Sequence, residues 1–182
     1  GHSSLRDNQT GTGNTASGAS SLASNTEGSD NTANGYGSLN RNTTGYSNTA
    51  HGAYSLIYNT KGYNNAAFGN NALQNNKEGY QNTAIGMSSL FTNESGDENI
   101  GIGYGAGNTI TTGNRNTIIG VNADVAYKDL FNTTVIGYNA KATSSNSIVL
   151  GNPLVYRIGG PVGWTSSSDV RIKKNIRDTH YG

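Results

Sequence analysis

The sequence predicts an all-β fold, a parallel β-solenoid (β-roll) in which each short repeat forms one coil. The first observation is composition: among 182 residues, 32% are hydrophobic and 13% are charged. This is too little apolar residue for an ordinary core and too little charge for a typical disordered chain. The second observation is a glycine that recurs at one constant interval, from Gly18 to Gly35 to Gly52 and onward, which indicates stacked repeats. We therefore expect about nine coils over residues 1–151.

Three residue types keep this 17-residue period, and one unit reads approximately N-T-A-x-G-x-x-S-L-x-x-N-x-x-G-x-x. The first glycine series is Gly1, Gly18, Gly35, Gly52, Gly69, Gly86, Gly103, Gly120 and Gly137, and the second is Gly11, Gly28, Gly45, Gly62, Gly79, Gly96 and Gly113. The asparagines are Asn14, Asn31, Asn48, Asn65, Asn82, Asn99 and Asn116, and the leucines are Leu5, Leu22, Leu39, Leu56, Leu73 and Leu90. We expect both glycine series to form corners with positive φ, and the asparagines to hydrogen-bond from coil to coil.

The N-T-A-x stretch before the first glycine predicts a short strand whose side chains alternate in direction. The residue two before the glycine is small and apolar, and we expect it to fill a thin interior together with the leucines. The residue one before the glycine changes from polar to branched apolar along the chain: Ser17, Asn34, His51, Phe68, Ile85, Ile102, Ile119, Ile136 and Leu150. An exposed apolar stripe of this kind favours association with identical chains about one axis, so we predict a homotrimeric fibre.

The repeat changes near the C-terminal end. Gly151 follows Gly137 at a shorter interval than separates the earlier glycines, which predicts a shorter last coil. Residues 152–167 hold both prolines and the single tryptophan, and we interpret them as a neck or linker. Residues 168–182 form a third segment.

The last coils, N-T-I-I-G-V-N-A and T-T-V-I-G-Y-N-A-K-A-T-S-S-N-S-I-V-L-G, resemble the head repeats of YadA-like trimeric autotransporter adhesins. Heads of that family are trimers of left-handed parallel β-rolls. The resemblance covers roughly residues 14 to 151 and implies adhesion to a surface. The usual repeat of that family is shorter than most coils of this chain, so the likeness leaves the handedness of this roll open.

The segment S-D-V-R-I-K-K-N-I, from Ser168, resembles the opening of the endosialidase-type intramolecular chaperone at the C-terminus of phage tail spikes and fibres. This resemblance implies cleavage between Ser168 and Asp169, with Ser168 as nucleophile and Lys173 as its base. The remainder of that domain does not follow in the sequence. We therefore expect a truncated chaperone start, and self-cleavage only where the complete domain is present.

Tyr46, Tyr63 and Tyr80 follow the second glycine series in successive coils and form a predicted aromatic ladder. Such a ladder can stack on sugar rings of a cell-surface receptor, or its members can stack only on one another. Apart from the resemblance at Ser168 and Lys173, the acidic residues include no recurring pair typical of a glycosidase, so the body of the chain is not predicted to be an enzyme. The sequence predicts no cofactor and no metal site.

The leading interpretation is a structural and receptor-binding segment of a homotrimeric fibre, on a virion tail or a cell surface. A net charge of +1 disfavours nucleic acid, and no apolar run reaches the length of a membrane span. The alternatives are an adhesin head of autotransporter type, a polysaccharide depolymerase, and an ice-binding solenoid. The last is suggested by a partial threonine file that Ala66 and Ile100 interrupt.

Overall fold

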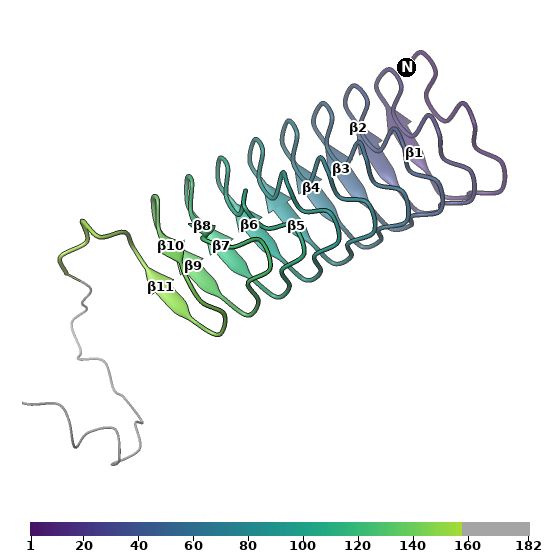
Figure 1. The fold of residues 1–182 in the computed structure, drawn as a ribbon. Helices are drawn as coiled ribbons and strands as arrows, with labels where there is room; N and C mark the ends of the chain where they lie inside the picture. The colour runs from purple at the N-terminus through teal and green to yellow at the C-terminus, as the bar shows by residue number, and fades with distance from the viewer. Residues whose placement is uncertain (158–182) are drawn as a thin grey trace, which may run out of the picture.

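The computed structural model describes residues 1–157 and shows a parallel β-solenoid whose coils stack along one axis (Figure 1). Its strands are β1 Thr15–Ser17, β2 Thr32–Asn34, β3 Thr49–His51, β4 Ala66–Phe68, β5 Thr83–Ile85, β6 Ile100–Ile102, β7 Thr117–Ile119, β8 Asp124–Val125, β9 Thr134–Ile136, β10 Lys141–Ala142 and β11 Ile148–Leu150. Nine of them form one sheet in the order β1-β2-β3-β4-β5-β6-β7-β9-β11, and β10 pairs with β8. Nine stacked strands enclose about eight turns, one fewer than expected.

The register of the sheet follows the sequence period. Thr15 pairs with Thr32 and Thr32 with Thr49, so each step advances by one full repeat. The last step is shorter, because Ile148 pairs with Thr134 and not with a residue one full repeat earlier. All these pairs are parallel, and the prediction of a constant coil with a contracted last turn is confirmed.

The interior contains the residues that were expected there. The central residue of each strand points inward, and Ala33, Ala50, Ala67, Ala84, Ile118 and Val135 are fully buried. Leu22, Leu39, Leu56, Leu73 and Leu90 are also fully buried and join them in one continuous core cluster. A buried serine precedes Leu22, Leu39, Leu56 and Leu90, whereas Ala72 precedes Leu73. Ser55 Oγ, for example, donates to the Gly52 carbonyl at 2.8 Å. The predicted assignment of interior residues is therefore confirmed.

The predicted asparagine ladder is present inside the coil. Asn48 donates from its backbone N and its Nδ2 to Asn31 Oδ1, both at 3.1 Å, and from Nδ2 to the Gly62 carbonyl at 2.8 Å. The pattern repeats up to Asn116, whose Oδ1 then accepts from Thr133 Oγ1 at 2.7 Å. Each buried amide is thus held by the coils on both sides, which rewards strict register.

A second asparagine ladder runs parallel to the first and was not singled out from the sequence. Its members are Asn8, Asn25, Asn42, Asn59, Asn76 and Asn93. Asn59 Nδ2 donates to Asn42 Oδ1 at 2.7 Å and to the Gly62 carbonyl at 3.0 Å. Two ladders of buried amides therefore flank the Gly-containing corners of the second series.

The two glycine series have different roles, which corrects one expectation. Gly18, Gly35, Gly52 and their successors to Gly137 have φ between 126° and 141°, as predicted for corners that L side chains rarely adopt. The second series does not have positive φ. A Cβ on Gly62 would lie 2.3 Å from Asn59 Oδ1 and 2.5 Å from the Gly79 carbonyl oxygen, so these positions are glycine because neighbouring coils leave no room.

Positive φ is also not confined to glycine. The ladder leucines from Leu5 to Leu90 adopt φ of 49° or 50°, in the left-handed region. Hydrogen bonds between coils fix this conformation: the backbone N of Leu56 donates to the Ala72 carbonyl at 3.1 Å. The left-handed residue turns the chain sharply while its side chain still points into the core.

One coil departs from the consensus, and side chains of this coil and its neighbours compensate for the departure. Gly107 occupies the leucine position, which would leave a hole in the core. Leu90 Cδ2 lies 2.7 Å from the point where a Gly107 Cβ would be, and the Cδ1 atoms of Ile118 and Ile110 lie 3.4 and 3.6 Å from it. Ile118 replaces the inward alanine of the following coil and Ile110 replaces the asparagine of the second ladder, so these two side chains and Leu90 fill the missing leucine volume.

Candidate functional site

The predicted aromatic ladder is present as a stacked column. The ring centroids of Tyr46 and Tyr63 lie 4.8 Å apart at an interplanar angle of 6°, and those of Tyr63 and Tyr80 lie 4.9 Å apart at 5°. Ring spacing therefore equals the usual distance between neighbouring strands. We call these three residues the tyrosine column.

The residues before and after each tyrosine fix the direction of its side chain. Each tyrosine follows a close-packed glycine of the second series, and the residue after it has a left-handed backbone. Gln81 has φ of 55°, and its backbone N donates to the Tyr63 carbonyl at 3.0 Å. Side chains at this corner are therefore aimed in the same direction in every coil.

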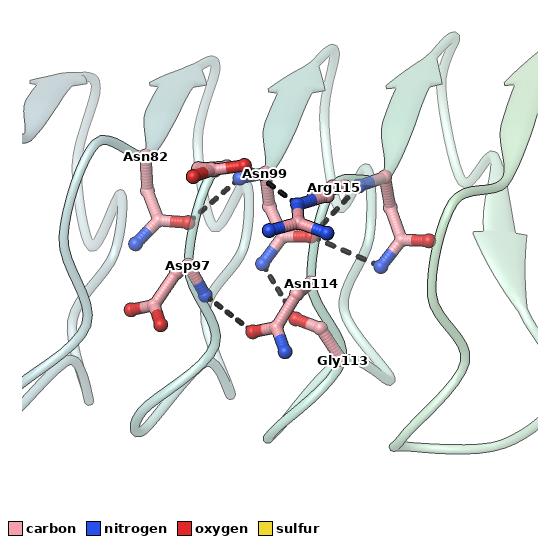
Figure 2. A network of polar contacts seen from close by, with 8 residues as sticks. Asn82, Asp97, Asn99, Gly113, Asn114 and Arg115 are labelled. Atoms are coloured by element: carbon pink, nitrogen blue, oxygen red, sulfur yellow. Dashed lines mark hydrogen bonds and ion pairs between the residues drawn. The ribbon is translucent and has the colours of Figure 1, made fainter.

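The column ends at two short polar residues and resumes with one aromatic residue. Asp97 and Asn114 occupy the next two positions, and Phe131 the third. Tyr80 donates from its backbone N to Asp97 Oδ1 at 3.0 Å, and Asp97 donates from its backbone N to Asn114 Oδ1 at 2.8 Å. Figure 2 shows Asp97 and Asn114 on successive coils, joined by the second of these bonds.

A cavity of about 470 Å³ lies where the column is interrupted, and we call it the slot. The aromatic residues Tyr80 and Phe131 line it, together with Asp97 and Asn114. Glu98, Arg115, Asn132 and Asn146 also line it. The slot is therefore an opening between two aromatic side chains, bordered by carboxylates, amides and one guanidinium. This is the combination of an apolar surface with a few convergent polar groups that small-molecule sites share.

Charge is unevenly neutralised in the slot. Arg115 Nε donates to Glu98 Oε2 at 2.9 Å, and this bond raises the pKa of Arg115. Asp97 has no such cation among residues 1–157; its partial burial raises the pKa of its carboxyl above the ordinary value, and the Tyr80 backbone bond only partly opposes this. The nearby Asp97 charge in turn raises the pKa of the Tyr80 hydroxyl. Of the two carboxylates in the slot, Asp97 is thus the one whose charge is compensated less.

The outer face of the long sheet forms a second candidate surface. The third residue of each strand points outward, as predicted, and we call this series the outer file. Phe68, Ile85 and Ile136 are 42%, 43% and 41% exposed, and Ile102 and Ile119 are half-buried. Toward the N-terminal end the same file holds Ser17, Asn34 and His51, with the His51 ring stacked 6.3 Å from the Phe68 ring. A single chain leaves the apolar part of this file facing solvent.

A third feature is a set of exposed charged residues between coils. Lys61 pairs with Glu78 at 3.6 Å and Lys77 with Glu94 at 3.1 Å, while the Arg41 guanidinium lies 4.7 Å above the Tyr58 ring. A shallow cavity of about 300 Å³ lies among these side chains. Because the ion pairs are open to water, each contributes at most about 1 kcal/mol. They support coil stacking and assign no ligand.

Comparison with models of protein families, with curated proteins and with solved structures gives no match to this chain. The resemblances to trimeric adhesin heads and to the intramolecular chaperone therefore stay predictions.

The structure describes some of the predicted site residues and not others. Tyr46, Tyr63 and Tyr80 come together in the column, whereas Ser168, Asp169 and Lys173 lie outside the described residues. Sequence reasoning missed Asp97, Asn114 and Phe131, although their position could be found by continuing the tyrosine series at its constant period.

Among residues 1–157, no helix combines the length and apolar character of a membrane span. In the same part of the chain, no three His, Cys, Asp or Glu side chains cluster as metal ligands would.

Proposed function

We propose that this chain is a structural and receptor-binding segment of a homotrimeric fibre, belonging to a phage tail or a similar appendage, that attaches its particle to a cell surface. The solenoid supplies the rod, and the outer file supplies the contact between chains. The proposed location is a virion tail or another extracellular surface. The resemblance at Ser168 to a chaperone of tail fibres favours the phage tail over a bacterial adhesin.

The outer file is the observation that carries the trimer. Its exposed side chains Phe68, Ile85 and Ile136 recur at the same strand position, so they form one narrow stripe along the rod. A narrow stripe on a straight rod is buried most simply when identical rods meet around a common axis. Burial of each large side chain contributes about 1.5–3 kcal/mol per chain.

The stripe also predicts where the chains touch most tightly. Ser17, Asn34 and His51 make the N-terminal part of the file polar, so the apolar contact begins at Phe68 and continues to the last coil. We expect the three chains to be held mainly by the C-terminal half of the solenoid, with a hydrated axis at the other end.

The solution mass tests the assembly. Light scattering of the purified chain is expected to give about three times the chain mass of 19.0 kDa. Ile85→Asp places a charge in the apolar stripe and is expected to lower the mass to that of one chain. Val121→Asp is the matched control, because Val121 is 44% exposed but lies outside the outer file. A folded wild-type monomer would overturn the trimer.

Attachment is tested separately. The trimer is expected to be retained on immobilised bacterial surface polysaccharide or lipopolysaccharide from at least one host. If the trimer is retained on none of them, the segment serves as a spacer and the receptor-binding half of the proposal is wrong.

A further inference from the structure

We propose that the slot between Tyr80 and Phe131 binds an uncharged oligosaccharide segment of about two sugar rings. This inference deepens the receptor-binding part of the proposed function and rests on it. It assigns recognition to the interruption of the tyrosine column, not to the column itself.

The spacing of the coils determines how much room the slot offers. Rings in the column repeat every 4.8–4.9 Å, and Phe131 stands three coils beyond Tyr80, a separation of about 14 Å along the axis. Two ring positions between them hold only the short side chains of Asp97 and Asn114. A sugar ring is about as thick as one coil, so two rings fit where two aromatic rings are missing.

Tyr80 is the last ring of the tyrosine column and lines the slot. Tyr63 stacks on one face of its ring at 4.9 Å, while the residue one repeat further on, Asp97, is not aromatic. The electron-rich face of an aromatic ring favours contact with polarised C–H groups, which one face of a sugar ring presents. A bound sugar would continue the stack that the protein leaves incomplete.

The slot also provides hydrogen-bonding groups for hydroxyls. Asp97 Oδ1 accepts from the Tyr80 backbone N, and the Asp97 carboxylate also interacts with the Tyr80 hydroxyl. Asn114 Oδ1 accepts from the Asp97 backbone N, whereas Asn114 Nδ2 donates no hydrogen bond within the described residues. A carboxylate with remaining acceptor capacity and an amide donor therefore line the slot on adjacent coils. Neighbouring hydroxyls of a sugar both donate and accept, so they can satisfy the two groups together.

Charge decides which sugars are suitable. Two carboxylates, Asp97 and Glu98, line the slot with a single guanidinium, and Arg115 is already paired with Glu98 at 2.9 Å. An anionic sugar would bring a third negative group beside the uncompensated Asp97, which is unfavourable. We therefore expect neutral hexoses or N-acetylhexosamines, and we expect uronic and sialic acids to be rejected.

The decisive variant fills the slot with a further tyrosine of the column. Asp97→Tyr continues the tyrosine column by one coil, in the geometry that already holds between Tyr46 and Tyr63. Ser29→Tyr is the matched control, because it extends the same column at its other end and touches no part of the slot. The two positions are equivalent even in their bonding: Thr12 donates its backbone N to Ser29 Oγ at 3.1 Å, as Tyr80 does to Asp97.

Binding is measured by saturation-transfer NMR and calorimetry on the intact chain, with cellobiose, maltose and N,N′-diacetylchitobiose as uncharged probes and digalacturonic acid as the anionic one. At least one uncharged probe is expected to bind in the millimolar range, with at least about tenfold weaker binding to Asp97→Tyr and unchanged binding to Ser29→Tyr. Phe131→Ala is expected to weaken binding as well, which covers the case in which Asp97→Tyr folds poorly.

Several outcomes would overturn the inference. Equal binding by wild type and Asp97→Tyr would exclude the slot, and loss of binding in Ser29→Tyr would point to the outer edge of the column instead. A lower solution mass of Asp97→Tyr would mean that a neighbouring chain fills the slot. Absence of binding to every uncharged probe would reject the ligand class. If no uncharged probe binds but the wild-type trimer is still retained on surface polysaccharide, the proposed function stands and this inference fails.

Discussion

Ile110 stands one repeat after Asn93 and ends the second asparagine ladder there. In the preceding coils Nδ2 of each asparagine donates to Oδ1 of the one before it; Asn93 Nδ2 donates to Asn76 Oδ1 at 2.9 Å. Because isoleucine has no donor, the buried Asn93 Oδ1 accepts no hydrogen bond from the described residues. The first ladder ends differently, since Thr133 replaces the next asparagine and keeps Asn116 Oδ1 bonded.

This difference predicts unequal effects of alanine along the second ladder. Asn59→Ala removes the donor to Asn42 Oδ1 and also the acceptor of Asn76 Nδ2, at 2.7 and 2.8 Å. Asn93→Ala removes only a donor, because its Oδ1 accepts no bond from the described part of the chain. We expect Asn59→Ala to lower the free energy of unfolding by about 1 kcal/mol more than Asn93→Ala. Urea denaturation at one protein concentration measures both, and equal losses would show that ladder bonds contribute little.

The close-packed glycines predict a second contrast. Gly62→Ala places a methyl group 2.3 Å from Asn59 Oδ1 and 2.5 Å from the Gly79 carbonyl oxygen, so coils must separate. We expect a loss of several kcal/mol, typical of overpacking a rigid interior. Gly105→Ala is the control: its φ is positive, but its Cβ meets only Asn122 Oδ1, at 2.9 Å. Melting temperatures that fall equally in the two variants would contradict this account.

The departures of one coil from the consensus predict coupled mutations. Gly107→Leu restores the ladder leucine, but its side chain enters space that Leu90, Ile110 and Ile118 already occupy. The single variant is therefore expected to be destabilised by about 1–3 kcal/mol. Adding Ile110→Asn and Ile118→Ala restores the consensus residue at both of these positions and is expected to recover most of that loss. A mutant cycle by thermal denaturation measures the coupling, and additive effects would refute the compensation.

The environment of Asp97 predicts a pH effect with a definite sign. Burial raises the pKa of its carboxyl in the folded chain above the unfolded value, so the folded chain holds more protons between the two values. Stability from this group is therefore highest at acidic pH and falls as pH rises through that window. Asp97→Asn is expected to remove this part of the dependence, measured as the difference in unfolding midpoint between acidic and neutral buffers.

The same carboxylate predicts how Tyr80 titrates. Its charge is the largest cause of the raised pKa of Tyr80, and Glu98 has a smaller effect. Asp97→Asn should therefore bring the Tyr80 pKa down toward its ordinary value, and Glu98→Gln should lower it less. Titration of ¹³Cζ-labelled tyrosine by NMR follows both, with Tyr80→Phe to assign the signal. The reverse order of effects would place the dominant charge on Glu98.

Much of the fold could be predicted because each coil repeats the same residue at the same place. The period alone determined the register of Thr15 with Thr32, the inward direction of Ala33 and the ladder through Asn48. The left-handed leucines could not be predicted in this way. Leu56 adopts positive φ because its backbone N bonds to Ala72 in the next coil, and leucine has no local preference for that conformation.

The candidate site was predicted only in its regular part. Tyr46, Tyr63 and Tyr80 stand out because they are identical, whereas Asp97, Asn114 and Phe131 share no residue type and look like variation between repeats. Their common direction is set by the backbone of the corner. The cavity exists because the side chains of Asp97 and Asn114 are shorter than an aromatic side chain. Such a site is marked in the sequence by positions where a series of identical residues is interrupted.

The strands of the long sheet are bonded only to the coil before and the coil after. One whole repeat inserted or deleted among the N-terminal coils would therefore restore the same contacts on both sides of the junction. Genes for such a chain can change rod length in whole steps by unequal recombination between repeats. The length of the solenoid can then evolve without any change to the residues around Asp97.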